Sequence, residues 1–162
     1  MIQLMFWILQ KKMKYNNNIF TVEKCKLNKV VKRFETPIFC YSEKKITENI
    51  NNFRKNFKSF SPIICFSTKS NSNLEILKEI KRNGLGADVV SKGELMIALK
   101  AGISSKKIVF SGVGKTRSEL IYAIEKNILL INCESKSEIL EIERIAKLKK
   151  KKVDIGIRLN PN

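Results

Sequence analysis

Apolar and polar positions alternate along the chain in blocks that predict strands and helices in turn. Six short apolar runs, several bounded by Pro, Gly or Ser, are typical of buried strands. The five longer segments between them carry apolar residues at helical spacing. We expect strands at 36–42, 62–68, 86–91, 107–112, 128–135 and 153–161, and helices at 43–57, 72–84, 92–102, 116–127 and 136–151.

This alternation predicts an α/β fold in which helices cover parallel strands. Two architectures fit, a doubly wound open sheet and a (β/α)8 barrel. A complete barrel usually needs about 250 residues, whereas this chain has 162. Periodicity alone therefore leaves open a barrel shortened to about six strands and an open sheet closed by its sixth strand.

The first residues stand apart from this pattern. The stretch MIQLMFWILQKK is apolar, but it lacks a basic start and a small-residue cleavage site, so we expect no signal peptide. No apolar run reaches the ~20 residues that a membrane helix needs. Met13 offers an alternative start. We therefore expect residues 1–14 to be an N-terminal extension and residues 15–162 to form one domain.

The formal net charge of +17 raises the question of nucleic-acid or membrane binding. Most basic residues are lysines spread along every expected helix, whereas arginine, which makes bidentate contacts with bases and phosphates, is scarce. The one dense run, KLKKKK at 147–152, falls at a helix end, where cations suit the helix dipole. We expect neither nucleic acid nor membrane as a partner and keep a basic nucleic-acid-binding domain as the least favoured alternative.

The cysteines and the absence of histidine limit the chemistry. Cys25, Cys40, Cys65 and Cys133 form no CxxC pair and the chain has no histidine, so we expect no metal site. Widely spaced cysteines beside apolar residues are typical of reduced thiols in a cytoplasmic protein. Without histidine the commonest general base is missing. Any chemistry must rest on Lys, Asp, Glu, Cys or a cofactor.

The stretch SGVGKT at 111–116 matches no phosphate-binding motif. A P-loop requires glycine where this chain has Val109, and a dinucleotide fingerprint requires glycine where it has Arg117. We interpret these glycines as residues for tight turns.

A lysine directly follows an apolar strand in ICFSTKSNSN, residues 64–73. Lys69 could be a solvated residue that begins a loop. Alternatively, it could be an active-site lysine with its stem buried by the strand, because such sites form at the carboxyl ends of parallel strands. Asp88 and Arg158 fall near the ends of other expected strands. Together they could hold an anionic cofactor or substrate, and a lysine beside a carboxylate suits Schiff-base chemistry.

Several motifs, in order, resemble the fold-type III pyridoxal-phosphate decarboxylases, the family of ornithine, diaminopimelate and arginine decarboxylases. They are CFSTKSNSN, GLGADVVSKGEL, AGISSKKIVFSGVGKTRSEL, LINCESKSEILEIERIA and IGIRLNPN. The third is most similar to the diaminopimelate branch, as is NNNIFTVEKCKLNKVVKRFETPIFCYS further upstream. The resemblance covers about residues 15–162.

The resemblance implies an alanine-racemase-like TIM barrel that binds pyridoxal 5′-phosphate. Lys69 would bind the cofactor covalently, Asp88 would lie beside both, and Glu94 and Arg158 would support the cofactor side of the pocket. The implied activity is that of a cytoplasmic carboxy-lyase of lysine biosynthesis, which converts the amino acid meso-diaminopimelate to L-lysine.

The sequence also departs from the family pattern. Thr68 and Ser70 flank the lysine where the family usually has Val and Ala. The family's ring-stacking histidine, glycine-rich phosphate loop and C-terminal β-domain have no counterpart here, and full-length relatives pair as homodimers. We therefore expect an N-terminal portion of the enzyme that is inactive alone. The alternatives are a non-catalytic pyridoxal-phosphate-binding or regulatory half-barrel, and a related ornithine- or arginine-type decarboxylase.

Overall fold

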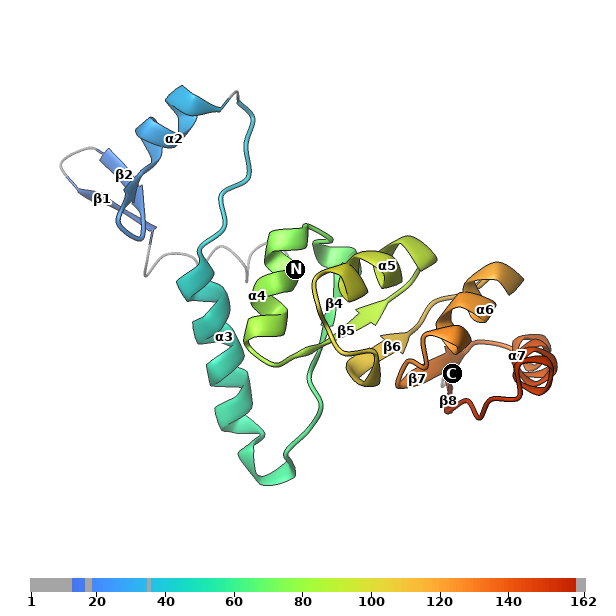
Figure 1. Cartoon of the computed structure of the whole chain (residues 1–162). Coiled ribbons are helices and arrows are strands. Elements are labelled where there is room, and N and C mark those ends of the chain that lie inside the picture. The colour runs from blue at the N-terminus through green and yellow to red at the C-terminus, as the bar shows by residue number, and fades with distance from the viewer. Residues whose placement is uncertain (1–12, 17–18, 35, 160–162) are drawn as a thin grey trace. The chain divides into compact units, whose positions relative to one another are not determined.

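The computed structural model describes residues 13–16, 19–34 and 36–159. The chain divides into two compact units, Met1–Ser61 and Pro62–Asn162 (Figure 1). The expected domain over 15–162 stays a prediction.

In its described residues, the first unit combines a small antiparallel sheet with two helices. The sheet has the order β1-β2-β3. Its strands are β1 (Met13–Asn16), β2 (Ile19–Val22) and β3 (Cys25–Lys26), followed by α2 (Leu27–Arg33), α3 (Glu43–Asn56) and the 3-10 turn η1 (Lys58–Phe60). The expected N-terminal extension thus overlaps β1 at residues 13 and 14, and its residues 1–12 lie outside the described part.

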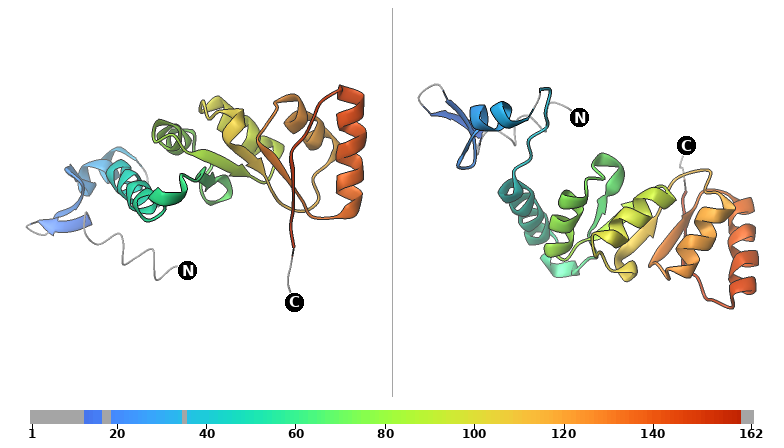
Figure 2. Two further views of the ribbon diagram at one scale, coloured as in Figure 1. Left: turned by 90° about the horizontal axis from the view of Figure 1, so that it is seen from below. Right: turned by 45° about the horizontal axis from the view of Figure 1, so that its top comes forward.

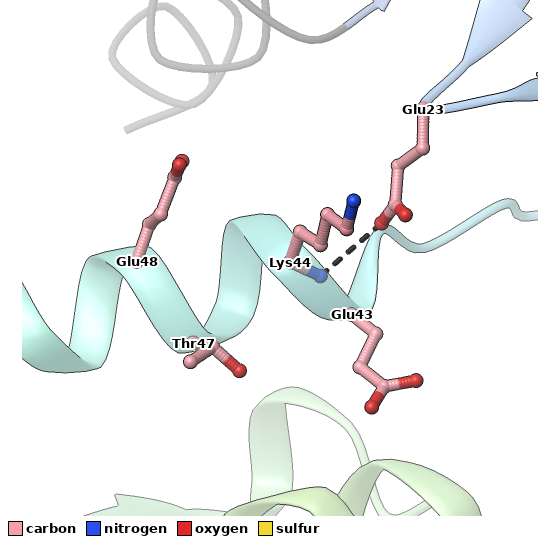
Figure 3. Close-up of a pocket in the computed structure, with 5 residues that line it drawn as sticks. All are labelled: Glu23, Glu43, Lys44, Thr47 and Glu48. Atoms are coloured by element: carbon pink, nitrogen blue, oxygen red, sulfur yellow. Dashed lines mark hydrogen bonds between the residues drawn. The ribbon is translucent and has the colours of Figure 1, made fainter.

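The start of α3 is held by a side chain from the turn after β2. The Ser42 hydroxyl donates to Glu23 Oε1 at 2.6 Å and accepts from the Lys45 amide at 3.1 Å. The same Glu23 oxygen accepts from the Lys44 amide at 3.1 Å, as Figure 3 shows. The adjoining surface hollow is lined by Glu23, Glu43, Lys44, Thr47 and Glu48 (Figure 3). Because helix N-termini carry unpaired N–H groups, these contacts cap α3.

The expected strand at 36–42 is wrong. These residues belong to no strand, and the Phe39 side chain is 89% exposed. A strand exists only through hydrogen bonds to a neighbouring strand, which an apolar run cannot supply by itself. The other five expected strands are confirmed as β4 to β8.

The second unit alternates strands with helices, as expected. The strands are β4 (Cys65–Ser67), β5 (Gly86–Val89), β6 (Ile108–Phe110), β7 (Leu130–Cys133) and β8 (Ile155–Ile157). The helices are α4 (Leu74–Arg82), α5 (Lys92–Lys100), α6 (Arg117–Glu125) and α7 (Lys136–Lys149), with 3-10 turns η2 (Thr68–Ser70) and η3 (Ser105–Lys107). Within the described ranges, no helix has the length and apolar character needed to cross a membrane.

The order of the strands decides between the two architectures. The five strands run parallel in the order β4-β5-β6-β7-β8. A doubly wound sheet reverses its order at a switch point and places helices on both faces. Here the order never reverses, and α4, α5, α6 and α7 follow one another along one side of the strands (Figures 1 and 2). The unit is therefore a stretch of barrel wall, and the open-sheet alternative is wrong.

The two faces of this sheet differ in chemistry. We call the helix-covered side the outer face; its buried strand residues are Ala87, Val89, Ile108, Phe110, Ile131 and Cys133. We call the opposite side the inner face; by strand register and alternation it carries Cys65, Ser67, Asp88, Val109, Ser111, Leu130, Asn132 and Gly156. Since side chains alternate along a strand, one set of positions packs the core and the other is left for polar groups.

Candidate functional site

Lys69 lies in a tight turn at the carboxyl end of β4. The turn is held by the Asn71 amide, which donates to the Thr68 carbonyl at 3.0 Å, and by the Ser70 hydroxyl, which donates to the Ser67 carbonyl at 2.7 Å. Thr68 is completely buried, whereas Lys69 is exposed. The predicted position at a strand end is confirmed. The expected burial of the lysine stem is not found.

Asp88 lies on the strand next to the one that leads to Lys69. In the parallel register Asp88 pairs with Ser67, two residues before the lysine. The Asp88 carboxylate accepts a hydrogen bond from the Ser111 hydroxyl at 2.5 Å. That hydroxyl accepts in turn from the Asn132 side-chain amide at 3.0 Å. Three adjacent strands therefore contribute to one line of polar side chains, near the carboxyl end of the sheet.

Glu94 lies in the first turn of α5 and contacts the turn that precedes the helix. Its carboxylate accepts from the Val90 amide at 2.9 Å, and its own amide donates to the Ser91 hydroxyl at 3.2 Å. The same pattern recurs at Glu138, which accepts from the Glu134 amide at 2.8 Å. The described contacts of Glu94 are those of a helix cap, and its expected contact with a cofactor stays a prediction.

Arg158 follows β8, away from the other predicted site residues. Its amide donates to the Cys133 carbonyl at 3.1 Å, and its guanidinium lies 3.4 Å from Glu134. Strands β6 and β7 separate β8 from the strand that carries Asp88. The sheet thus brings Lys69 and Asp88 together on neighbouring strands but leaves Arg158 at the far edge of the described strands.

A buried ion pair between the loop after β6 and the start of α7 was not predicted from the sequence. The Lys115 ammonium donates to the Gly112 carbonyl, the Asn132 carbonyl and Glu138 Oε1 at 2.7, 2.7 and 2.8 Å. The Lys115 and Glu138 side chains are only 1% and 9% exposed. The turn interpretation of the glycines is confirmed, since Gly112 and Gly114 have φ values of +95° and +70°. Lys115 comes just before the N-terminus of α6, where the helix dipole disfavours a positive charge. A lysine at such a position in the sequence indicates that nearby acceptors must stabilise its charge.

The cysteines near the site are poor nucleophiles. Burial raises the pKa of the Cys65 thiol, and the negative charge of Asp88 raises it further against the opposing effect of Lys107. Burial also raises the pKa of Cys133, and Glu138 adds to that shift. Because the thiolate is the reactive form, both side chains favour the unreactive thiol. Lys69 adds an amine nucleophile in the turn after β4, the strand next to the one that carries Asp88.

Comparison with known proteins agrees with this arrangement. The family model described as "Pyridoxal-dependent decarboxylase, pyridoxal binding domain" matches residues 43–162. The chain belongs to this family. The match covers α3 and every strand of the parallel sheet, so it includes Lys69, Asp88, Glu94 and Arg158.

Two curated relatives of the chain are named diaminopimelate decarboxylase. The chain is 46% identical over 129 residues to the diaminopimelate decarboxylase of Helicobacter pylori strain J99, covering 80% of the chain and 32% of the relative. It is 39% identical over 150 residues to that of Aquifex aeolicus, covering 93% of the chain and 35% of the relative. The chain therefore spans about a third of the length of these relatives.

Solved structures confirm the barrel fold. The M. jannaschii diaminopimelate decarboxylase in co-complex with L-lysine superposes with a TM-score of 0.90 at 35% identity, over 94% of this chain and 36% of that one. The Helicobacter pylori diaminopimelate decarboxylase complexed with L-lysine gives a TM-score of 0.81 at 42% identity, over 85% and 35%. The predicted resemblance to this decarboxylase family is confirmed.

Proposed function

We propose that this chain forms the cofactor-binding part of a pyridoxal-phosphate-dependent decarboxylase in which Lys69 holds the cofactor. One observation carries the proposal: the register pairs Asp88 with Ser67, so a carboxylate lies on the strand beside the one that leads to Lys69. An exposed amine can reach an aldehyde, and a neighbouring negative charge suits the cationic nitrogen that an amine and an aldehyde form together. The donor set therefore fits pyridoxal phosphate.

The cofactor and the chain have separate tasks in this proposal. When bound, pyridoxal phosphate supplies an aldehyde that binds amines and a ring that accepts the electron pair left by the departing carboxylate. Lys69 would hold the cofactor through its side-chain amine. Asp88, which accepts from Ser111, holds a negative charge at a fixed place beside the lysine. Glu94 and Arg158 are proposed to support the cofactor side, Glu94 through the turn that follows β5.

The proposed reaction of the whole protein is decarboxylation of meso-diaminopimelate to L-lysine. The relatives that share 46% and 39% identity are named for this reaction. Two similar structures were solved with L-lysine, which is the product of that reaction. The substrate class is accordingly an amino acid.

We also propose that the whole protein is a homodimer located in the cytoplasm. We propose that it binds neither nucleic acid nor membranes. The lysine run at 147–152 supports the last of these, since several of its charges are engaged within the chain. Lys147 pairs with Glu143 and Lys149 with Glu125, each at 2.6 Å, and the Lys151 ammonium donates to the Ile124 carbonyl at 3.2 Å. Engaged lysines are less available for phosphate groups.

The first test is chemical trapping of the cofactor. The full chain is incubated with pyridoxal phosphate, reduced with borohydride and mapped by peptide mass spectrometry. We expect one phosphopyridoxyl group per chain, at Lys69. Lys69→Arg should lose this label. The matched control Lys106→Arg should keep it, because Lys106 is an exposed lysine at the amino end of β6 and not at a carboxyl end of the sheet. Label scattered evenly over surface lysines, or unchanged in Lys69→Arg, would overturn the assignment of Lys69.

The second test concerns the substrate. Carbon dioxide release from meso-diaminopimelate is compared with release from ornithine and arginine, using the whole protein loaded with cofactor. Release from meso-diaminopimelate alone supports the proposed reaction. A preference for ornithine or arginine would replace it with the related decarboxylase activity.

A further inference from the structure

The inner face assigns a role to two residues that sequence analysis passed over, and this role rests on the proposed function. We propose that Ser111 and Asn132 are positioning residues that hold the Asp88 carboxylate in place beside the lysine strand, and that Lys115 fixes the spacing of the strands that carry them. None of the three is proposed to touch substrate.

The hydrogen bonds of this line have a defined direction. A serine hydroxyl has one proton to donate. The Ser111 oxygen accepts from Asn132 Nδ2 at 3.0 Å, and its proton is donated to Asp88 Oδ1 at 2.5 Å. Asp88 Oδ1 is thus the final acceptor of the line. With one oxygen held, the carboxylate cannot rotate freely, and its second oxygen keeps a fixed place.

The Asn132 side chain is itself held by close packing against β8. Asn132 pairs with Gly156 in the register. A Cβ atom added at Gly156 would lie 2.4 Å from Asn132 Oδ1, a distance that real Cβ contacts do not reach. The carboxamide oxygen therefore lies directly over the glycine, and the nitrogen is left to face Ser111. Glycine at position 156 thus gives the amide the room that this orientation needs.

Lys115 joins the two strands at their backbones. Its ammonium donates to the carbonyl of Gly112, the residue after Ser111, and to the carbonyl of Asn132 itself. Its third acceptor is the buried carboxylate of Glu138. An ammonium has three protons, and each has an acceptor here. This clamp sets the distance between the carboxyl ends of β6 and β7, and so the distance between the Ser111 and Asn132 side chains.

The first experiment needs no cofactor, so it is independent of the proposed function. The side-chain amide signals of Asn132 are followed by nitrogen-15 NMR in the full chain. Asp88→Ala should shift these signals, because the loss of the acceptor frees the Ser111 proton and weakens the next bond in line. The matched control Ser118→Ala removes a hydroxyl that bonds with Thr116 on the exposed side of α6 and should leave them in place. Unchanged Asn132 signals in Asp88→Ala would overturn the line of bonds.

The second experiment measures cofactor affinity. Ser111→Ala should weaken pyridoxal-phosphate binding about tenfold, the scale of one hydrogen bond to a charged group. Ser111→Thr retains the hydroxyl and should restore affinity to within about twofold. The pH midpoint of the bound cofactor's visible absorbance should move in Ser111→Ala and return in Ser111→Thr, which a merely structural defect would not produce.

The outcomes separate the two proposals. If Ser111→Ala and Asn132→Ala each weaken binding and the double variant is no weaker than the worse single variant, the residues act through one path to Asp88. Wild-type affinity in Ser111→Ala would overturn their positioning role even if Lys69 is labelled. Failure to label Lys69 in the wild type would instead remove the proposed function, and the NMR result would still decide whether the line of bonds exists.

Discussion

The outer and inner faces of the parallel sheet are built from the same short strands, yet they obey different rules. On the outer face Ala87, Val89, Ile108 and Phe110 are completely buried against the helices. On the inner face the corresponding positions include Asp88, which is half-buried and hydrogen-bonded. The strand period of two lets one strand serve the core with one residue and the site with the next. Alternate residues of one strand therefore serve the packed core and the candidate site.

The two faces also differ in how strictly they specify a residue. Apolar packing tolerates exchange among side chains of similar volume. The line Asp88–Ser111–Asn132 requires an acceptor, a group that both accepts and donates, and a donor, in that order. The outer face should therefore dominate stability, and the inner face should dominate binding.

The sharpest stability contrast is between neighbours on β6. Phe110→Ala removes a side chain with no exposed surface and should lower the free energy of unfolding by about 4 kcal/mol. Val109→Ala, on the inner face of the same strand, should lower it by about 1 kcal/mol, because this side chain is only half-buried. Chemical unfolding of the full chain measures both. Equal losses would show that the two faces contribute alike to stability and would contradict the division between them.

The buried ion pair is the exception to the division, because it is polar and yet should matter for stability. Lys115→Met leaves the Glu138 carboxylate, only 9% exposed, without its cation, and should cost about 3 kcal/mol. Lys115→Met combined with Glu138→Gln should recover part of this loss, because a neutral amide needs no counter-charge. A double variant that is as unstable as the sum of the two single variants would contradict the buried pair as the cause.

The sequence predicted what depends on local pattern. Five of the six expected strands and the helices between them follow from periods of two and 3.6 residues, which each segment carries by itself. The run at 36–42 has the same apolar character but belongs to no strand, because a strand also requires a partner. The placement of Lys69 and Asp88 near one edge followed from a general rule for parallel strands, so it was accessible too.

The contacts that pattern cannot predict join residues far apart in the chain. Ser111 and Asp88 are 23 residues apart, and Lys115 and Asn132 are 17 apart. Finding them requires the register between strands, which a single sequence does not state. One local sign was available: Ser111 directly follows an apolar strand, and Asn132 is a polar residue within one. Such residues are candidates for inner-face contacts.

Thr68 tests the division from another side, since it places a polar atom among buried groups. Its Oγ1 atom is buried and has no hydrogen-bond partner within the described part of the chain. Thr68→Val keeps the shape and removes the unsatisfied hydroxyl, so it should raise the free energy of unfolding by about 1 kcal/mol. Thr68→Ser is the control, because it keeps the hydroxyl and loses a methyl group, and it should destabilise by about 1 kcal/mol. A melting temperature lowered by Thr68→Val would show that the hydroxyl is not a cost.

The smallest expected effect concerns Glu119, whose carboxylate connects the starts of α5 and α6. It accepts hydrogen bonds from the amides of Lys92 and Thr116. Burial alone would raise the pKa of Glu119, but hydrogen bonds from the Thr116 and Lys92 amides outweigh it and hold this pKa below the ordinary 4.5. A lowered pKa means that the unfolded chain takes up the proton first as the solution is acidified. The stabilisation is therefore complete above pH 4.5 and is lost as the pH falls through the lower folded value. Glu119→Gln should cost about 0.5 kcal/mol near neutrality, and this difference from the wild type should shrink in acid. The control Ser118→Ala, in the same turn, should show no such pH dependence. If the difference in free energy of unfolding between Glu119→Gln and the wild type stays constant with pH, packing and not the ionised cap joins the two units.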